Sequence, residues 1–542
     1  MKKILFLFFI VSYHSLFAQP GNNESRPKLV IGLVVDQMRW DYLYRFKDNY
    51  AKNGFERLLR EGFSCENTMV PYVPTYTAPG HTSIYTGSVP SINGIVGNDW
   101  YDANTKRNMY CTQDDSVNTV GSTSVLGKMS PRNMLTTTVT DELRLATNFK
   151  SKVFGVSLKD RGAILPAGHS ANAAYWYDDT NGRWISSTYY QPELPAWLVN
   201  YNSKDWVENA MTKDWNLLLP IEKYNQSTSD DKPYEGKLPE EASPVFPHKL
   251  SQIKRSRYSA FKYTPFAATY TFNMAKEIIT QEKMGVGNST DMITISISST
   301  DYAGHSFGPN SMEIEDTYLR LDRDIADFLQ FLDTKIGKGN YLLFLTADHA
   351  AAHVPGFAKE HNIPAGNYSS GTLSKQLKDL LVEKYGSDSM VIKIQNNQVY
   401  LNKSFFSKES QLATAVQETI LQFLIDQPFI SFAFNNKDIA SATMPQPIKE
   451  RLINGYNPKR SGQIGYVLLP GYIGMGSTGT THGAWNPYDA HIPLVWFGTG
   501  IKPGKTTSEA YMTDIAPTLS ALLKIQMPNG SVGKVLPLVP DK

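Results

Sequence analysis

Three aspartates in this chain each follow a short apolar run that is typical of a buried β-strand. They are Asp36 after residues 29–35, Asp301 after residues 292–297, and Asp348 after residues 341–345. In an open α/β sheet, ligands bind outside the carboxyl ends of the strands. We therefore expect the three carboxylates to meet in one site although they lie far apart in the sequence.

Histidines accompany two of these aspartates. His305 lies four residues after Asp301, and His349 directly follows Asp348, while His482 lies in a glycine-rich stretch near the C-terminus. Carboxylate oxygen and imidazole nitrogen are suitable ligands for zinc or a similar divalent ion. A single Asp–His pair at a strand end is often only a hydrogen-bonding loop, but the whole set favours a metal site.

A threonine between the first two aspartates is a candidate nucleophile. In the segment 74–81, Thr77 is expected to cap a helix whose first turn contains Pro79. At such a helix end, free backbone N–H groups and the helix dipole favour an attacking alkoxide and an incoming phosphate. The alternative is that Thr77 only caps the helix. A metal that ligates the hydroxyl would make it nucleophilic.

Taken in order along the chain, these residues resemble the two-zinc constellation of the alkaline phosphatase superfamily. The matching positions are Asp36, Thr77, Asp301-x3-His305, Asp348-His349 and His482. Two further segments, residues 74–81 and Gly94-Ile-Val-Gly-Asn98, resemble the branch that contains nucleotide pyrophosphatase/phosphodiesterases and PafA-type alkaline phosphatases. The resemblance covers most of the chain and implies an α/β fold with a doubly wound, mostly parallel sheet flanked by helices.

The resemblance also implies a role for each matching residue. One zinc ion would be held by Asp301, His305 and His482, and a second by Asp36, Asp348 and His349 together with Thr77. Thr77 would act as the nucleophile and form a phosphothreonine intermediate. Asn98 would hydrogen-bond a phosphoryl oxygen.

A lysine and an arginine bear on the choice of substrate. Lys159 and Arg161 follow the apolar run 153–158 and resemble the Lys-x-Arg pair of PafA-type monoesterases. A phosphate monoester is a dianion whose terminal oxygens need cationic partners, whereas a diester carries an alkyl group there. The pair therefore predicts that the substrates are small phosphate monoesters. If Lys159 and Arg161 are ordinary solvated charges, a phosphodiesterase or nucleotide pyrophosphatase is the alternative, and an inactive exported zinc-binding protein is the third.

Composition and the N-terminal residues predict an exported enzyme. The chain has 542 residues and a formal charge of only +2, which removes the electrostatic argument for a nucleic-acid binder. Residues 1–18 contain an early Lys-Lys pair, an apolar stretch and Ala18, as expected for a signal peptide. An uncleaved anchor is the alternative. We expect the mature chain to be periplasmic or secreted, with no membrane span.

The remaining chain, residues 19–542, is expected to form one catalytic domain with two insertions. The first, about residues 166–265, is rich in Trp and Tyr and is either a cap over the site or a satellite core. The second, about residues 350–472, contains a hairpin signal at Asn396-Asn397 and is expected to be a small α+β subdomain. The cysteines, Cys65 and Cys111, could pair if the fold brings them together.

Overall fold

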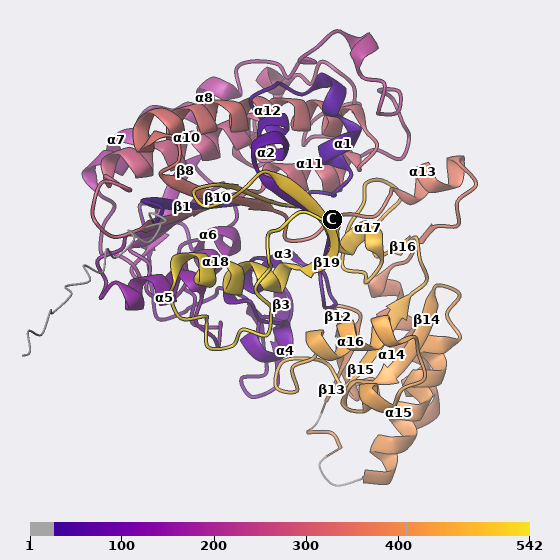
Figure 1. The fold of residues 1–542 in the computed structure, drawn as a ribbon. Coiled ribbons are helices and arrows are strands. Elements are labelled where there is room, and N and C mark those ends of the chain that lie inside the picture. Colours follow the sequence, from indigo (N-terminus) through magenta and orange to yellow (C-terminus); the bar gives the residue numbers. More distant parts are fainter. Residues whose placement is uncertain (1–25, 403, 407–409, 542) are drawn as a thin grey trace, which may run out of the picture.

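The computed structural model describes residues 26–402, 404–406 and 410–541, and its main feature is a large central sheet (Figure 1). The predicted signal peptide, residues 1–18, lies outside the described residues. The middle of the sheet is parallel, in the order β10 (Tyr341–Thr346), β1 (Leu29–Val35), β9 (Asp291–Ile297), β6 (Val153–Ser157) and β7 (Ala173–Asp178). Every residue of these five strands is buried, which explains their nearly continuous apolar sequences.

Other strands extend the sheet at both sides. Beyond β10 lie β18 (Leu494–Gly498), β2 (Phe63–Met69) and β17 (His491–Ile492), and β19 (Gly504–Tyr511) also pairs with β2. Beyond β7 lie β8 (Arg183–Ser187) and β5 (Thr119–Val120). Strand β18 has an apolar sequence like those of the parallel strands, but it is antiparallel to β10. An apolar run indicates burial on both faces and does not encode strand direction.

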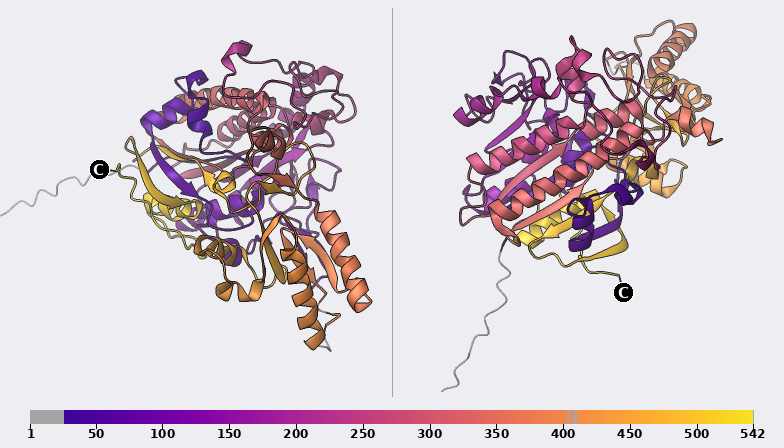
Figure 2. Two further views of the ribbon diagram at one scale, coloured as in Figure 1. Left: turned by 90° about the vertical axis from the view of Figure 1, so that its right-hand side faces the viewer. Right: turned by 90° about the horizontal axis from the view of Figure 1, so that it is seen from above.

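Helices cover both faces of the sheet, as Figure 1 shows. One face carries α1 (Tyr42–Arg45), α2 (Phe55–Glu61), α10 (Phe266–Gln281), α11 (Ser299–Phe307) and α12 (Met312–Leu332). The other carries α3 (Thr77–Thr86), α4 (Pro90–Asn93), α5 (Val139–Ala146), α6 (Asp160–Ala167) and α18 (Ile515–Leu523). Figure 2 shows the long helices α10 and α12 side by side over the sheet. The predicted doubly wound, mostly parallel α/β fold is confirmed.

The aromatic segment predicted as the first insertion is partly continuous with the sheet. It supplies β7 and β8, followed by α7 (Ala196–Asn202), α8 (Trp206–Ala210) and α9 (Arg257–Phe261). Trp184 and Trp215 are fully buried in the main hydrophobic core, and Trp176 packs against α6 in a neighbouring cluster. The boundary near residue 166 therefore falls before two strands of the central sheet, and these three rings stabilise the core.

The second insertion contains a sheet of its own. Strands β12 (Val391–Gln395), β13 (Gln398–Leu401), β15 (Ile464–Leu468) and β14 (Ile430–Asn435) pack against α14 (Ser370–Tyr385) and α15 (Ser410–Ile425). We name this part, residues 370–468, the four-stranded unit; in Figure 1 it projects from the main body in orange. The predicted hairpin is present, because Asn396 and Asn397 both have left-handed φ angles of 55° between β12 and β13.

Shorter elements complete the fold. They are β3 (Asp99–Asp102), β4 (Arg107–Tyr110), α13 (Pro355–Glu360), β11 (Gly366–Asn367), α16 (Gln446–Gly455), β16 (Tyr472–Ile473) and α17 (Pro487–Ala490). Within the part of the chain that the structure describes, no helix is both long and apolar enough to cross a membrane.

The two cysteines do not pair. Cys65 is buried in the main core on β2, whereas Cys111 is buried in a separate cluster with Trp100, and both thiols are free. The condition for the predicted disulfide, proximity in the fold, is not met. Burial raises the pKa of the Cys65 thiol to about 12, so this thiol stays protonated at neutral pH.

Candidate active site

The carboxyl ends of the parallel strands bring the predicted residues together at one edge of the sheet. Asp36 follows β1 directly, Asp348 follows β10 after one residue, and Asp301 lies in the first turn of α11, which follows β9. Six side chains form two groups of three. Within each group, the three possible ligand atoms lie within 4.8 Å of one another. The first group is Asp301, His305 and His482, and the second is Asp36, Asp348 and His349.

The first group is built on helix α11. Asp301 and His305 are four residues apart in this helix and therefore share one face, with 3.2 Å between Asp301 Oδ1 and His305 Nε2. His482 comes from a distant loop, and its Nε2 lies 3.6 Å from the same carboxylate oxygen. Helix α11 thus holds Asp301 and His305 at a fixed spacing, whereas His482 is brought to them by the tertiary structure.

Backbone carbonyl groups orient all three histidines in the same way. Each Nδ1 lies within hydrogen-bonding distance of a carbonyl oxygen, and a carbonyl can only accept, so Nδ1 is the donor and Nε2 is left unprotonated in the neutral ring. The pairs are His305 with Thr480 at 2.7 Å, His482 with Thr75 at 2.6 Å and His349 with Ala350 at 3.0 Å. The three Nε2 atoms face the carboxylates, as metal ligands require.

The second group is completely buried. Asp36, Asp348 and His349 have no exposed surface. Within the described residues, Asp36 Oδ1 and Asp348 Oδ2 are buried without a hydrogen-bond partner. Buried carboxylate oxygens without partners are costly unless a cation is bound. This donor set therefore fits a divalent metal ion, and the group around Asp301 fits a second.

The acidic groups influence one another strongly. Burial raises the pKa of Asp36 well above its usual value, and the neighbouring Asp301 and Asp348 carboxylates raise it further. Burial also acts to raise the pKa of Asp301, but the nearby His305 and Lys159 lower this pKa well below its usual range. Charges packed this closely are typical of functional sites.

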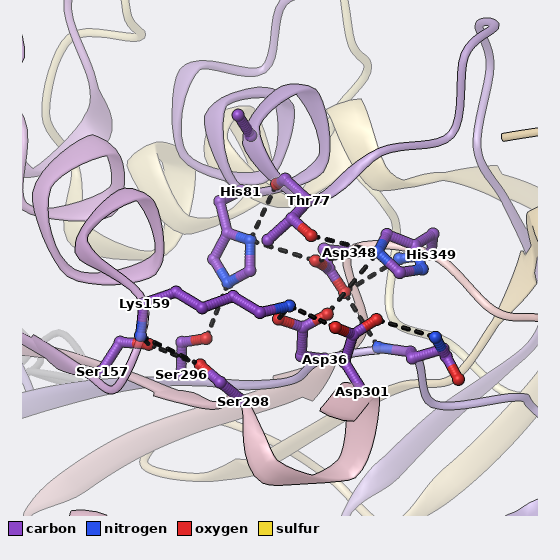
Figure 3. Close-up of polar contacts among 12 residues, drawn as sticks. Asp36, Thr77, His81, Ser157, Lys159, Ser296, Ser298, Asp301, Asp348 and His349 are labelled. Carbon is purple, nitrogen blue, oxygen red and sulfur yellow. Dashed lines mark hydrogen bonds and ion pairs between the residues drawn. The ribbon is translucent and has the colours of Figure 1, made fainter. Parts of the chain in front are cut away.

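Thr77 lies next to the second group. It is the first residue of α3, and its Oγ1 lies 3.4 Å from His349 Nε2 (Figure 3). The helix cap itself is Tyr76, with no side-chain cap bond, so the expectation that Thr77 caps this helix was wrong. One position further into the helix, the hydroxyl points at His349 of the second group (Figure 3). Pro79 lies in the first turn as predicted.

Asn98 is tied to the same helix end. Its Oδ1 accepts a hydrogen bond of 2.9 Å from the backbone N–H of Ala78, the residue after Thr77. The amide of Asn98 is thus held beside Thr77.

Helix α3 can approach the second group closely because residue 80 is glycine: a Cβ atom there would lie 2.4 Å from the backbone oxygen of Asp348.

Lys159 is buried between the two groups. Its Nζ is 2.7 Å from Asp36 Oδ2 and 2.5 Å from Asp301 Oδ2, so it bridges the two groups (Figure 3). Burial alone would lower the pKa of Lys159, but Asp301 and Asp36 raise it above its usual value. Arg161, two residues later in α6, donates to the hydroxyl of Tyr110 at 3.0 Å.

Sequence reasoning missed two residues of the site. Gln37 has a left-handed φ of 64°; its backbone N–H donates to Asp348, and its side-chain amide donates to Asp301 at 2.7 Å. His81 is fully buried on α3, 3.2 Å from Asp348 Oδ2. Its spacing of four residues from Thr77 in a predicted helix was the available signal.

Comparisons with known proteins agree with this architecture. The type I phosphodiesterase / nucleotide pyrophosphatase family matches residues 30–489. The chain is 51% identical to alkaline phosphatase PhoV of Synechococcus elongatus over 521 residues, 94% of this chain and 92% of the relative. It is 49% identical to alkaline phosphatase PafA of Elizabethkingia meningoseptica over 536 residues, 98% of each chain. A crystal structure of wild-type PafA has a TM-score of 0.93 at 48% identity, covering 95% of this chain and 99% of that one.

Proposed function

Since the chain belongs to the type I phosphodiesterase / nucleotide pyrophosphatase family and is a phosphoric monoester hydrolase of the alkaline phosphatase type, we propose that it is an exported two-zinc enzyme. It would hydrolyse small phosphate monoesters through a phosphothreonine intermediate. The observation that carries this proposal is the pair of three-residue ligand groups with the Thr77 hydroxyl at the edge of one of them.

The choice of zinc follows from the ligands. Each group mixes carboxylate oxygen with imidazole nitrogen and contains no thiolate, and three protein ligands leave coordination positions open for substrate. Asp301, His305 and His482 would hold one ion, and Asp36, Asp348 and His349 the other. When bound, the two ions would supply Lewis acidity to the nucleophile and to the leaving oxygen.

Thr77 would carry the covalent step. Its Oγ would lose its proton and attack phosphorus in line with the ester bond, and the leaving oxygen would take up a proton as its bond to phosphorus breaks, which gives a phosphothreonine and a free alcohol. Water would then attack the phosphothreonine, release inorganic phosphate and restore the hydroxyl. Helix α3 would favour both steps, because the positive N-terminal end of its dipole lies at Thr77, where negative charge develops.

Asn98, Lys159 and Arg161 would bind the phosphoryl group. The side chain of Asn98 is fixed beside Thr77, where it can donate to a phosphoryl oxygen. Lys159 Nζ lies between the two ligand groups, and Arg161 lines a neighbouring cavity with it. Two cations on one side of the site favour a dianionic monoester over a monoanionic diester.

Localisation and domain organisation are part of the same proposal. We assign residues 1–18 to a signal peptide that directs the protein to the periplasm or beyond, because Lys2, Lys3, an apolar stretch and Ala18 follow the pattern of a cleaved leader. Residues 19–542 would form the catalytic domain, with the two insertions described above.

The test is the ratio of kcat/KM for an aryl phosphate monoester and the matching methyl aryl diester, measured on zinc-loaded mature protein. We expect a ratio far above one. A ratio below one would assign the chain to diester hydrolysis, the other activity in the name of the matched family. Stoichiometric metal binding without turnover of either ester would instead identify a non-catalytic zinc-binding protein. Chelation should remove the activity and added zinc should restore it.

A further inference from the structure

A cavity of about 240 Å³ lies beside the site, between the main body and the four-stranded unit. The main body contributes Tyr76 and the loop 481–484, which carries His482. The four-stranded unit contributes Tyr466 on β15 and the hairpin turn at Asn396-Asn397. The cavity therefore borders one of the proposed metal ligands and the residue that precedes Thr77, but it has no role in the chemistry derived above.

Four tyrosine rings form part of the wall of this cavity. They belong to Tyr76, Tyr368, Tyr466 and Tyr472. The ring of Tyr368 is held from behind by Phe429, with centroids 4.9 Å apart and planes 19° apart. Its hydroxyl donates to Asn397 Oδ1 at 2.9 Å, which fixes the ring at the rim. Because these contacts hold the Tyr368 ring in place without a ligand, a planar ligand can stack on it with little loss of side-chain conformational entropy.

Several polar side chains also line the cavity, and two of them are held in place. Asn396 donates to the backbone oxygen of Asp99 at 2.7 Å, which anchors the hairpin turn to the main body. Asp489 is 1% exposed; one of its oxygens accepts from the Ala484 N–H at 2.8 Å, and the other has no partner among the described residues. Fixed polar groups beside aromatic rings are typical of a small-molecule site.

The position of the cavity relative to the reaction identifies what it can bind. In an in-line displacement the leaving oxygen departs on the side opposite the nucleophile. Thr77 lies beside His349, in the second ligand group, so the leaving oxygen is expected at the group of Asp301, His305 and His482. The organic part of the substrate is attached to that oxygen, and the cavity beside His482 lies on that side.

We infer that this cavity is the leaving-group site of the enzyme and that it selects phosphate monoesters whose leaving group contains a planar aromatic ring. The inference rests on the proposed monoesterase function and adds the substrate class. Tyr368 and Tyr466 are the specificity-determining residues, since Tyr466 belongs to the four-stranded unit, Tyr368 lies just before it in the sequence, and both lie outside the two ligand groups. The four-stranded unit would thus contribute one wall of the substrate site.

The test compares benzyl phosphate with cyclohexylmethyl phosphate. Both release a primary alcohol of similar size and reactivity, so the ratio of their kcat/KM values isolates recognition of a flat ring. We expect the wild-type enzyme to prefer benzyl phosphate by at least about threefold, the size of one aromatic contact. In Tyr368→Ala the ratio should fall towards one, whereas Tyr368→Phe, which keeps the ring, should retain it.

Tyr385→Ala is the matched control. Tyr385 ends helix α14 in the same four-stranded unit but does not line the cavity, so its loss should leave the ratio unchanged. A wild-type ratio near one would overturn the inference. So would a high ratio that persists in both Tyr368→Ala and Tyr466→Ala, because the ring would then be recognised elsewhere.

A binding measurement separates this inference from the proposed function. Benzylphosphonate and cyclohexylmethylphosphonate cannot be hydrolysed, so their Kd values can be measured by calorimetry on the zinc-loaded protein. Tighter binding of the benzyl compound that is lost in Tyr368→Ala supports the cavity even if no ester is turned over, in which case only the proposed function fails. Equal Kd values together with normal turnover contradict the cavity alone.

Discussion

His81 lies 3.2 Å from Asp348 on the face of α3 that also carries Thr77. Its Nδ1 is also 2.9 Å from the Thr77 carbonyl oxygen, and its Nε2 is 2.8 Å from Ser296 Oγ (Figure 3). A single buried imidazole therefore connects the helix of the proposed nucleophile, a proposed metal ligand and strand β9. Such contacts behind a ligand fix its orientation.

We therefore expect His81→Ala to reduce kcat and the affinity for the metal at the second group by about 10- to 100-fold. The physical reason is that Asp348 loses the imidazole that lies 3.2 Å from its Oδ2, and Ser296 keeps a buried hydroxyl without a partner. Steady-state kinetics and a zinc titration measure the two effects. His81→Asn places an amide N–H near the position of Nδ1 and should recover part of both. A variant that loses stability but keeps its zinc affinity would argue against positioning.

Thr77→Ala is expected to lower kcat at least about 1000-fold, because no other hydroxyl occupies the attacking position. Zinc content should persist, since the six other ligands are untouched. Thr77→Ser, which keeps a hydroxyl at the start of α3, should retain measurable turnover. Elemental analysis and a phosphate-release assay check both expectations, and near-normal turnover of the alanine variant would disprove the nucleophile.

The double variant Lys159→Ala/Arg161→Ala is expected to reduce kcat/KM for a monoester by about 100-fold or more. The loss for the matching methyl diester should be several-fold smaller, because a diester presents less charge to these cations. The measurement is the kcat/KM of each ester with each protein. Equal losses on both esters would mean that the two side chains only stabilise the acidic cluster. Lys249→Ala, which removes an exposed cation far along the chain, serves as the control.

Stability should depend on pH through Asp141, which belongs to the capping box at the start of α5. Burial acts to raise the pKa of Asp141, but His169 and hydrogen bonds from Thr138 and Ser170 lower it to about 2. An unfolded aspartate has a pKa of about 3.9, so the stabilisation is present above that pH and is lost as the pH falls towards 2. The pKa of His169 is raised in the folded protein. Its contribution to stability is therefore present below about pH 6.5, the pKa of an unfolded histidine, and is lost at higher pH.

Asp141→Asn should therefore cost about 2 kcal/mol of unfolding free energy near pH 5, and the cost should disappear towards pH 2. Thermal unfolding of both proteins across this pH range gives the comparison. Asp379→Asn, an exposed change on α14, should have no comparable effect. A cost that does not change with pH would show that packing at this position, and not the charge, is what stabilises α5.

Much of this architecture could be predicted from local sequence. The apolar runs around Ile31, Ile295 and Leu343 predict buried strands because all three are flanked by polar residues and are too short for buried helices. The hairpin at Asn396-Asn397 could be predicted because both residues tolerate positive φ. The strand direction of β18 could not, since an apolar run carries no information on the direction of its neighbours.

For the site, the sequence by itself determined the types of ligand and their grouping by strand ends: Asp36, Asp348-His349 and Asp301-x3-His305 are each local signals. Only the tertiary structure decided how they are completed. His482 reaches Asp301 from more than 170 residues away, and Gln37 connects both ligand groups. These contacts depend on the packing of α3 and α11 against neighbouring strand ends. That packing is set by long-range burial, which no short stretch of sequence encodes.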